Sequence, residues 1–162
     1  MPVTETVSRT KLLLLALAVL WSSGCLSSQT MITVNASEKG LAALRPEESS
    51  HLVDAIETQL RQVTSEPINR LDQKLVDEKS SAMSDYRVLA GICVGGSLPI
   101  SRIYVLEERS DHTIAVFIDD QGGWPLGASF TKSVVGAVER ALAQVFPGHD
   151  VRIEQSVGPD FR

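Results

Sequence analysis

The chain has 162 residues, and its 20 Asp and Glu outnumber its 15 Lys and Arg, so the net charge is −5 with histidine neutral. A chain of this length fits one domain. A mildly acidic protein without a cluster of basic residues lacks the positive surface that binds phosphate backbones, so we expect no nucleic-acid partner.

An uninterrupted apolar run lies near the N-terminus, between Leu12 and Trp21, and Arg9 and Lys11 precede or begin it. The run has the length of a signal-peptide core, about 7–15 residues, and is shorter than the ~20 residues that a membrane-spanning helix needs. Small residues follow at 22–24. We therefore predict an export signal over residues 1–24.

The residue after these small side chains is Cys25, and the whole segment resembles a bacterial lipoprotein signal. The resemblance implies that Cys25 is lipidated and becomes the mature N-terminus, although Ser22 stands where the family usually has Leu. Two alternatives stay open: cleavage that leaves Cys25 as a free thiol, and an uncleaved N-terminal anchor. Because Leu26 rather than Asp follows the cysteine, the resemblance implies the outer membrane, with the domain facing the periplasm.

The segment after the signal is predicted to form a polar tether at residues 25–30 and a single domain at residues 31–162. Residues 1–24 hold two basic residues and one acidic residue, so the remainder has 13 basic and 19 acidic residues and a net charge of −6. Cys93 lies in an apolar run and is expected to be a small buried residue. A disulfide to Cys25 requires that Cys25 is not lipidated.

Apolar residues recur at helical spacing in three segments, which predicts helices over about 46–64, 70–80 and 129–146. Pro46 suits the start of the first helix, and Pro147 with Gly148 ends the last. The β-branched residues of segment 31–36 predict a strand before them.

Three runs with period-two patterning predict a strand meander over about 86–118, made of Tyr86–Val94, Ile103–Leu106 and Thr113–Ile118. Alternate residues from Tyr86 to Val94 are expected to share one face. Residues 119–127 are predicted as a loop and 151–157 as an edge strand. This order of elements predicts an α+β fold, an α/β sandwich in which helices pack on a mixed sheet.

Two enzyme motifs are nearly matched. Gly91–Gly96 has the glycine spacing of a P-loop, but Ser97 replaces the lysine that phosphate binding needs. Ser129–Lys132 matches the S-x-x-K pattern of penicillin-recognising serine enzymes, whose partner motifs are absent. We interpret Ser129 or Thr131 as a helix N-cap.

No residue is predicted to be catalytic. The three histidines, His51, His112 and His149, lack metal-ligand spacing, so they are interpreted as solvated side chains near turns or helix ends, and we expect no metal and no cofactor. A further alternative is a cation site made by Asp111 with His112 and Asp119 with Asp120, if their loops converge. An enzyme would need Ser129, Asp119 and His112 to meet in the fold.

The glycine-rich segment 122–127 holds Trp124, Pro125 and Leu126, which are candidates for apolar contacts with a partner protein. The alternative is that Trp124 folds back and covers the end of the core. Both are kept open at this point.

The segments Asn69–Asp72, Asp85–Gly91 and Ser110–Thr113 resemble a class of envelope lipoproteins over about residues 46–146. This class includes the curli-secretion lipoprotein, lipoprotein activators of penicillin-binding proteins and the N-terminal domain of the TolB type. Ile114 stands where the family has a glycine. The resemblance implies a non-catalytic module that docks on other envelope proteins.

The sequence therefore favours a lipid-anchored periplasmic interaction or accessory module, bound to the membrane through its N-terminal lipid and to an envelope protein partner. The first alternative is a small ligand-binding lipoprotein with a cleft between the sheet and the two N-terminal helices. The second is a minor hydrolase.

Overall fold

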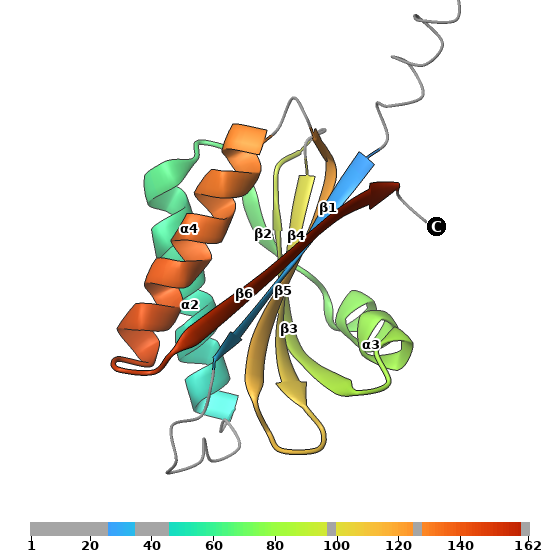
Figure 1. Ribbon diagram of the computed structural model, residues 1–162, viewed down its shortest axis with the longest axis vertical. Coiled ribbons are helices and arrows are strands. Elements are labelled where there is room, and N and C mark those ends of the chain that lie inside the picture. The colour runs from blue at the N-terminus through green and yellow to red at the C-terminus, as the bar shows by residue number, and fades with distance from the viewer. Residues whose placement is uncertain (1–25, 35–45, 97–99, 125–127, 160–162) are drawn as a thin grey trace, which may run out of the picture.

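The computed structural model describes residues 26–34, 46–96, 100–124 and 128–159, and within them the α+β prediction is confirmed (Figure 1). The predicted meander and the three predicted helices are present. The elements follow the order β1 (Leu26–Val34), α2 (Pro46–Val63), β2 (Ile68–Arg70), α3 (Gln73–Ala82), β3 (Tyr86–Val94), β4 (Ile100–Glu108), β5 (Ile114–Trp124), α4 (Ala128–Val145) and β6 (Val151–Pro159).

The strands form one sheet in the order β2-β3-β4-β5-β1-β6. Every described strand pair is antiparallel, whereas the sequence predicted a mixed sheet. The difference arises because the two helical crossovers, β1-α2-β2 and β5-α4-β6, connect strands that run in the same direction but are not neighbours. Other strands lie between each pair, so no parallel ladder forms.

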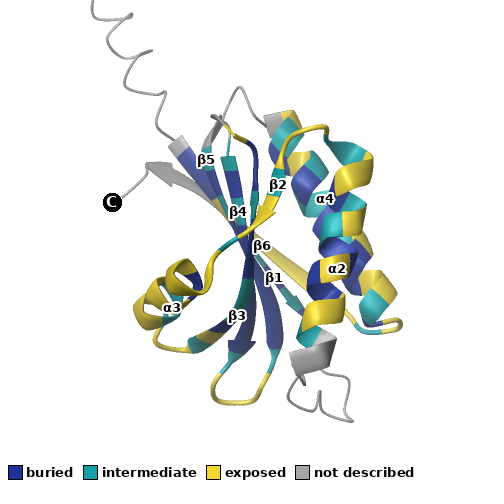
Figure 2. Cartoon of the chain, turned by 180° about the vertical axis from the view of Figure 1, so that it is seen from behind, coloured by how far each residue is buried: buried dark blue, intermediate teal, exposed yellow. Residues whose placement is uncertain are grey.

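Helices cover both faces of this sheet. We call the face covered by α2 and α4 the inner face, and the face on which α3 lies the outer face. Figure 2 shows buried positions on the sheet-facing sides of α2 and α4 and along the central strands. The inner-face core includes Ile32, Ile56, Leu60, Val116 and Leu142, each fully buried.

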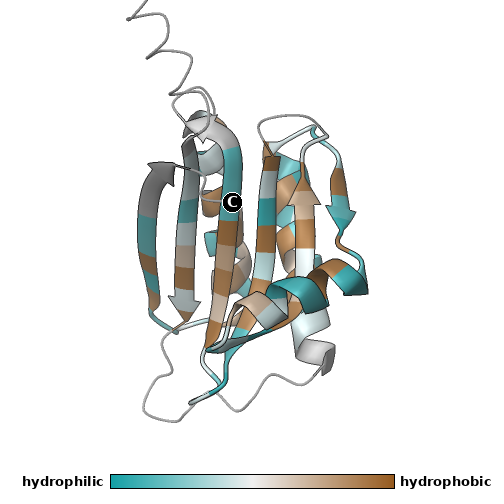
Figure 3. Cartoon of the chain, turned by 90° about the vertical axis from the view of Figure 1, so that its right-hand side faces the viewer, coloured by the Kyte–Doolittle hydropathy of each residue, from teal (hydrophilic) through white to brown (hydrophobic). Residues whose placement is uncertain are grey.

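The outer face has a smaller core, in which Val76 of α3 packs with Tyr104 and Phe117. Figure 3 shows the hydrophobic residues along the central strands, with α3 lying across one end of the sheet. The side chain of Lys79 lies over both aromatic rings, with Nζ 5.2 Å from the Tyr104 centroid and 4.9 Å from that of Phe117. This cation covers apolar surface that α3 leaves partly open.

A β-bulge in β3 contradicts the predicted alternation of this strand. The register with β4 shifts between Val88 and Ala90. Val88 therefore belongs to the outer-face core, whereas Ile92 and Val94 belong to the inner-face core. One extra residue reverses the face on which all later side chains lie.

Gly91 lets the chain before α3 approach β3 closely. The Leu71 amide donates to the Gly91 carbonyl at 2.8 Å, and a Cβ at Gly91 would lie 2.7 Å from Leu71 Cδ1. No real Cβ is accommodated at that distance unless Leu71 moves. The glycine is therefore needed for this contact rather than for a phosphate loop.

Several predicted boundaries are wrong, and polar strand residues are the reason. Residues 26–30 form the first part of β1 and not a tether. Ser28 and Thr30 are buried, because they face the sheet interior and not water. Likewise, β5 continues through most of the predicted 119–127 loop, because Asp120 and Gln121 pair with Ser101 and Ile100 of β4.

Candidate functional site

Trp124, one of the residues selected from the sequence, lies at the end of the sheet where β1 begins. Leu26 is the Cα partner of Trp124 in β5 and of Pro159 in β6. We call this the Leu26 end. Cys25, Pro125 and Leu126 lie outside the described residues, and for Trp124 the structure gives the strand pairing. The backbone thus places Trp124 beside the residue that follows Cys25.

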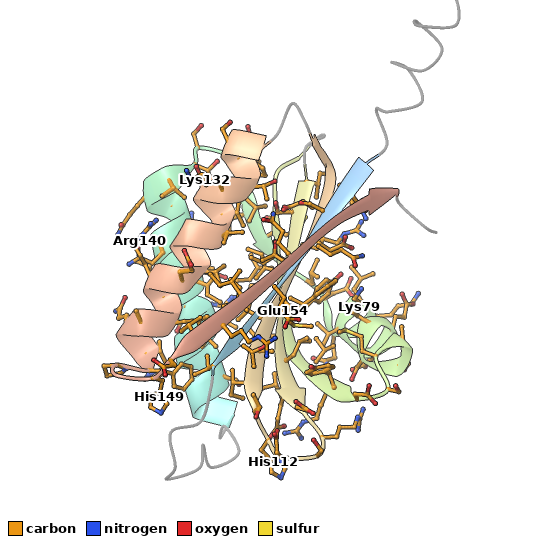
Figure 4. All side chains as sticks on the ribbon, in the orientation of Figure 1. Lys79, His112, Lys132, Arg140, His149 and Glu154 are labelled. Atoms are coloured by element: carbon orange, nitrogen blue, oxygen red, sulfur yellow. The ribbon has the colours of Figure 1, made fainter. Side chains whose placement is uncertain are left out.

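The β4–β5 hairpin forms the opposite end of the sheet, where Figure 4 shows His112. Glu107 is 2% exposed there and contacts a guanidinium group and an imidazole ring. Arg87 Nε donates to Glu107 Oε2 at 2.9 Å, its terminal nitrogen contacts the same oxygen, and His112 Nδ1 lies 2.9 Å from Oε1. Sequence reasoning missed this cluster and interpreted His112 as a solvated turn residue.

The turn itself explains how His112 reaches Glu107. His112 has a φ of 62°, in the left-handed region, and its amide donates to the Glu108 carbonyl at 3.0 Å. Asp111 Oδ1 accepts from the Thr113 amide at 2.8 Å. Hydrogen bonds from the Thr113 hydroxyl and amide lower the pKa of Asp111. Asp111 therefore stabilises the turn.

A second buried carboxylate, Asp120, lies on the inner face near the Leu26 end. It is 1% exposed, and Ser28 Oγ donates to its Oδ2 at 3.2 Å. The hydroxyls of Ser101 and Thr131 also donate to it. Burial raises its pKa above the usual 3.8, more than these hydrogen bonds lower it. One carboxylate thereby joins β1, β4, β5 and α4.

The hydrogen bond of Thr131 corrects the N-cap interpretation. α4 begins at Ala128, so Ser129 and Thr131 both lie inside its first turn. The Ser129 carbonyl accepts from Ser133 Oγ at 2.9 Å. The S-x-x-K segment therefore holds the start of α4 and a buried threonine that donates a hydrogen bond to Asp120.

The residues that an enzyme would need do not meet. Asp119 is seven residues from His112 along nearly extended chain, about 23 Å at ~3.3 Å per residue. Figure 4 shows Lys132, one turn from Ser129, at the end of the molecule opposite His112. Asp119 and Asp120 are consecutive strand residues, so their side chains lie on opposite faces and cannot share a cation. Within the described segments, no group of three or more His, Cys, Asp or Glu could hold a metal ion.

Two hollows lie elsewhere on the surface. The larger, about 510 Å³, lies between α2 and α4 and is lined by His51, Asp54, Ala55, Thr58, Gln144 and Val145. The smaller, about 280 Å³, lies beside β1 and β6 and is lined by Gln29, Met31, Phe117, Glu154 and Gln155. The predicted cleft between the sheet and both N-terminal helices is not formed, because α2 and α3 lie on opposite faces.

Cys93 is a half-buried free thiol. It lies in β3 opposite Arg102 and Asn69, rather than in the core as expected. The bulge explains this position, since it turns Ile92 and Val94 inward and Cys93 outward.

Comparisons with known proteins establish neither a family nor a function. No family model matches the chain, and no curated protein does. Among solved structures, the chain is similar to a hydantoinase/carbamoylase family amidase from Burkholderia ambifaria, with a TM-score of 0.34 and 10% identity. The match covers 83% of this chain and 28% of that one, and at this level neither a family nor an activity follows. None of the described helices is long and apolar enough to span a membrane.

Proposed function

We propose that this chain is a lipid-anchored, non-catalytic module of a cell-envelope assembly, facing the periplasm from the outer membrane. Cys25 is the lipidated residue, and Trp124, Pro125 and Leu126 contact an envelope protein partner. The observation that carries the proposal is the pairing of Leu26 with Trp124. It supports the proposal because Leu26 follows Cys25 in the chain and Trp124 precedes Pro125.

The early start of β1 supports a contact close to the membrane. Because Leu26 already belongs to β1, only one peptide bond separates a lipidated Cys25 from the sheet. A Trp-Pro-Leu segment at that end suits a partner that is itself at the membrane surface. Aromatic side chains are also frequent at membrane interfaces, where an apolar ring and a polar edge are both satisfied.

Charge supports the same orientation. Asp85, Glu108 and Asp111 gather around the hairpin, at the end opposite Leu26, with Arg109 among them. Anionic lipid headgroups repel carboxylates, so an upright domain with the hairpin away from the membrane is electrostatically favoured. The separation of Ser129, Asp119 and His112 favours a contact role over hydrolysis.

Intact-mass measurement of the product from a native envelope tests the anchor. We expect loss of residues 1–24 and a mass gain from acyl chains, together with recovery in the membrane fraction. The Cys25→Ser variant should lose both. An unprocessed, unacylated chain among soluble proteins would contradict the proposal.

Substitution at the contact segment tests the partner site. In membranes dissolved with a mild detergent, Trp124→Ala should reduce the native size of the complex, while acylation and circular dichroism stay unchanged. Leu75→Ala is the matched control, since Leu75 is 45% exposed on α3. An unchanged complex in Trp124→Ala would exclude this segment as the contact.

A ligand-binding role is the second candidate, and the hollow between α2 and α4 is the observation that favours it. Its lining mixes the His51 imidazole, the Asp54 carboxylate and the Gln144 amide with apolar Ala55 and Val145. A screen of small polar ligands by thermal shift checks this role, because a ligand stabilises only the state it binds.

A further inference from the structure

The two edges of the sheet differ in how well they are protected against pairing. The β2 edge is three residues long and follows Pro67, which has no amide hydrogen to donate. Arg70 in β2 is held by Asp54 at 2.5 Å and by Glu57 at 2.6 Å, both on α2. This short edge is therefore fixed to the helix behind it and presents little backbone to another strand.

The β6 edge is nine residues long and pairs with β1 along one side only, within the described residues. Its Ile153 lies opposite Ile32, so it faces the inner side, yet it is 43% exposed. The reason is that α4 packs over β5 and β1. An apolar side chain and a row of backbone donors and acceptors are thus open together, which sheet edges normally avoid.

The charges of β6 are ordered in a self-complementary way. Arg152 and Glu154 flank Ile153 and lie on the outer face, where they form an ion pair at 2.6 Å within the strand. When two copies of β6 pair antiparallel with Ile153 opposite Ile153, Arg152 of each copy lies opposite Glu154 of the other. Opposite charges directly across an antiparallel ladder are stabilising, and like charges are destabilising.

Neighbouring registers lack this match. In the register that pairs Glu154 with Glu154, two glutamates lie opposite each other. In the register that pairs Arg152 with Arg152, two arginines do. In the register that pairs Gln155 with Gln155, Glu154 lies opposite Ser156. The order Arg-Ile-Glu therefore selects one register and one occupant, a second copy of the same chain.

We propose that β6 is the interface of a two-fold symmetric homodimer in which two six-stranded sheets join through Ile153. The interface is an edge contact and is smaller than that of permanent dimers, so we expect a dissociation constant on the order of micromolar. The proposal does not depend on the lipid at Cys25.

Charge reversal tests it. Sedimentation velocity of the product purified from cells in mild detergent is compared for the unaltered chain, Arg152→Glu, Glu154→Arg and the double variant. Each single variant places like charges at both cross-strand positions, so its dissociation constant should rise about tenfold or more. The double variant restores both pairs and should return to within about threefold of the unaltered chain.

Circular dichroism of all four proteins shows whether folding is kept. Two results would overturn the dimer: an unaltered chain that stays monomeric at about 100 µM, or equal association in the single and double variants. Because acylation is measured separately by mass, failure of the dimer and failure of the lipid anchor are distinguishable.

Disulfide trapping tests the register. In a Cys93→Ser background, Ile153→Cys should form an intermolecular disulfide under mild oxidation, because two-fold symmetry brings the two positions opposite each other. Gln155→Cys is the matched control and should cross-link more slowly. Faster cross-linking of Gln155→Cys would overturn the register, and no cross-linking of either variant would overturn the interface.

Discussion

Two carboxylates are buried at opposite ends of the same sheet, and their partners differ in kind. Glu107, at the hairpin end, is held by Arg87 and His112. Asp120, near the Leu26 end, is held by serine and threonine hydroxyls. Both are almost fully removed from water.

The two sets of partners differ in whether they can also act as hydrogen-bond acceptors. Arginine only donates and is always positively charged, so the Glu107 site favours a charged acceptor. Hydroxyls donate or accept, so the Asp120 site can rearrange around a neutral side chain. The hairpin end should therefore depend strongly on charge, whereas the Leu26 end should tolerate its loss.

Removal of the cation at the hairpin end should have the largest effect. Arg87→Met leaves the Glu107 carboxylate buried with the His112 imidazole as its remaining side-chain partner, and we expect a loss of about 3 kcal/mol in the free energy of unfolding. Glu107→Gln should cost less, about 1–2 kcal/mol, because the Arg87 side chain is 55% exposed and water can solvate it. Urea unfolding measures both.

The double variant Arg87→Met with Glu107→Gln separates charge from packing. It should recover part of the loss of Arg87→Met, since no buried charge is left unpaired. A double variant as unstable as the sum of the two singles would show that the pair is not coupled.

Asp120→Asn should have a smaller effect of the opposite sign. Burial disfavours the charged form of Asp120, and a neutral amide removes that cost, so we expect a gain of about 1 kcal/mol in the free energy of unfolding at pH 7. Burial raises the folded-state pKa above 3.8, so the stabilising contribution of Asp120 is complete below pH 3.8 and is lost as pH rises through the folded pKa.

The advantage of the asparagine variant should therefore be absent below pH 3.8 and grow as pH rises through the folded pKa, then stay constant. Thermal unfolding across this range checks the sign. An asparagine variant that is less stable at pH 7, or whose difference is independent of pH, would show that the hydroxyls stabilise the charged form.

The smallest effect is expected at Thr30, which lies two residues after Ser28 in β1 and on the same inner face. Its Oγ1 is buried, and among the described residues it has no hydrogen-bond partner. Thr30→Val keeps the shape and removes the unsatisfied hydroxyl, so we expect a gain of about 0.5–1 kcal/mol. Loss of stability in urea unfolding would mean that this hydroxyl is bonded in solution.

The sequence pattern predicted the helices with a wide apolar stripe. It missed the strand ends and the β-bulge, which depend on pairing between strands. The helix predicted over 129–146 agrees with α4, because its apolar residues repeat at helical spacing. By contrast, the polar residues Ser28 and Asp120 are expected from sequence alone to be exposed to solvent, but they are buried where β1 pairs with β5. The β3 bulge leaves no mark in the alternation of Tyr86–Val94, since both faces of that strand are apolar.

The candidate site divides in the same way. Cys25, Pro125 and Leu126 rest on motifs and stay predictions. The Arg87–Glu107 contact could have been found once the register of β3 against β4 was known, because that register puts Arg87 directly opposite Glu107. The left-handed His112 was beyond reach, as its side-chain direction depends on the backbone of the turn.

The antiparallel direction of β6 also determines where two anchors would lie in a joined pair. The symmetry axis passes between the two Ile153 residues, beside Ile32, and Leu26 is six residues away along β1, about 20 Å at ~3.3 Å per residue. The two Leu26 ends of a joined pair would therefore point to opposite poles, roughly 40 Å apart. If both copies carry a lipid next to Leu26, a pair on one bilayer would lie with its strands along the surface, whereas the upright orientation belongs to the single chain.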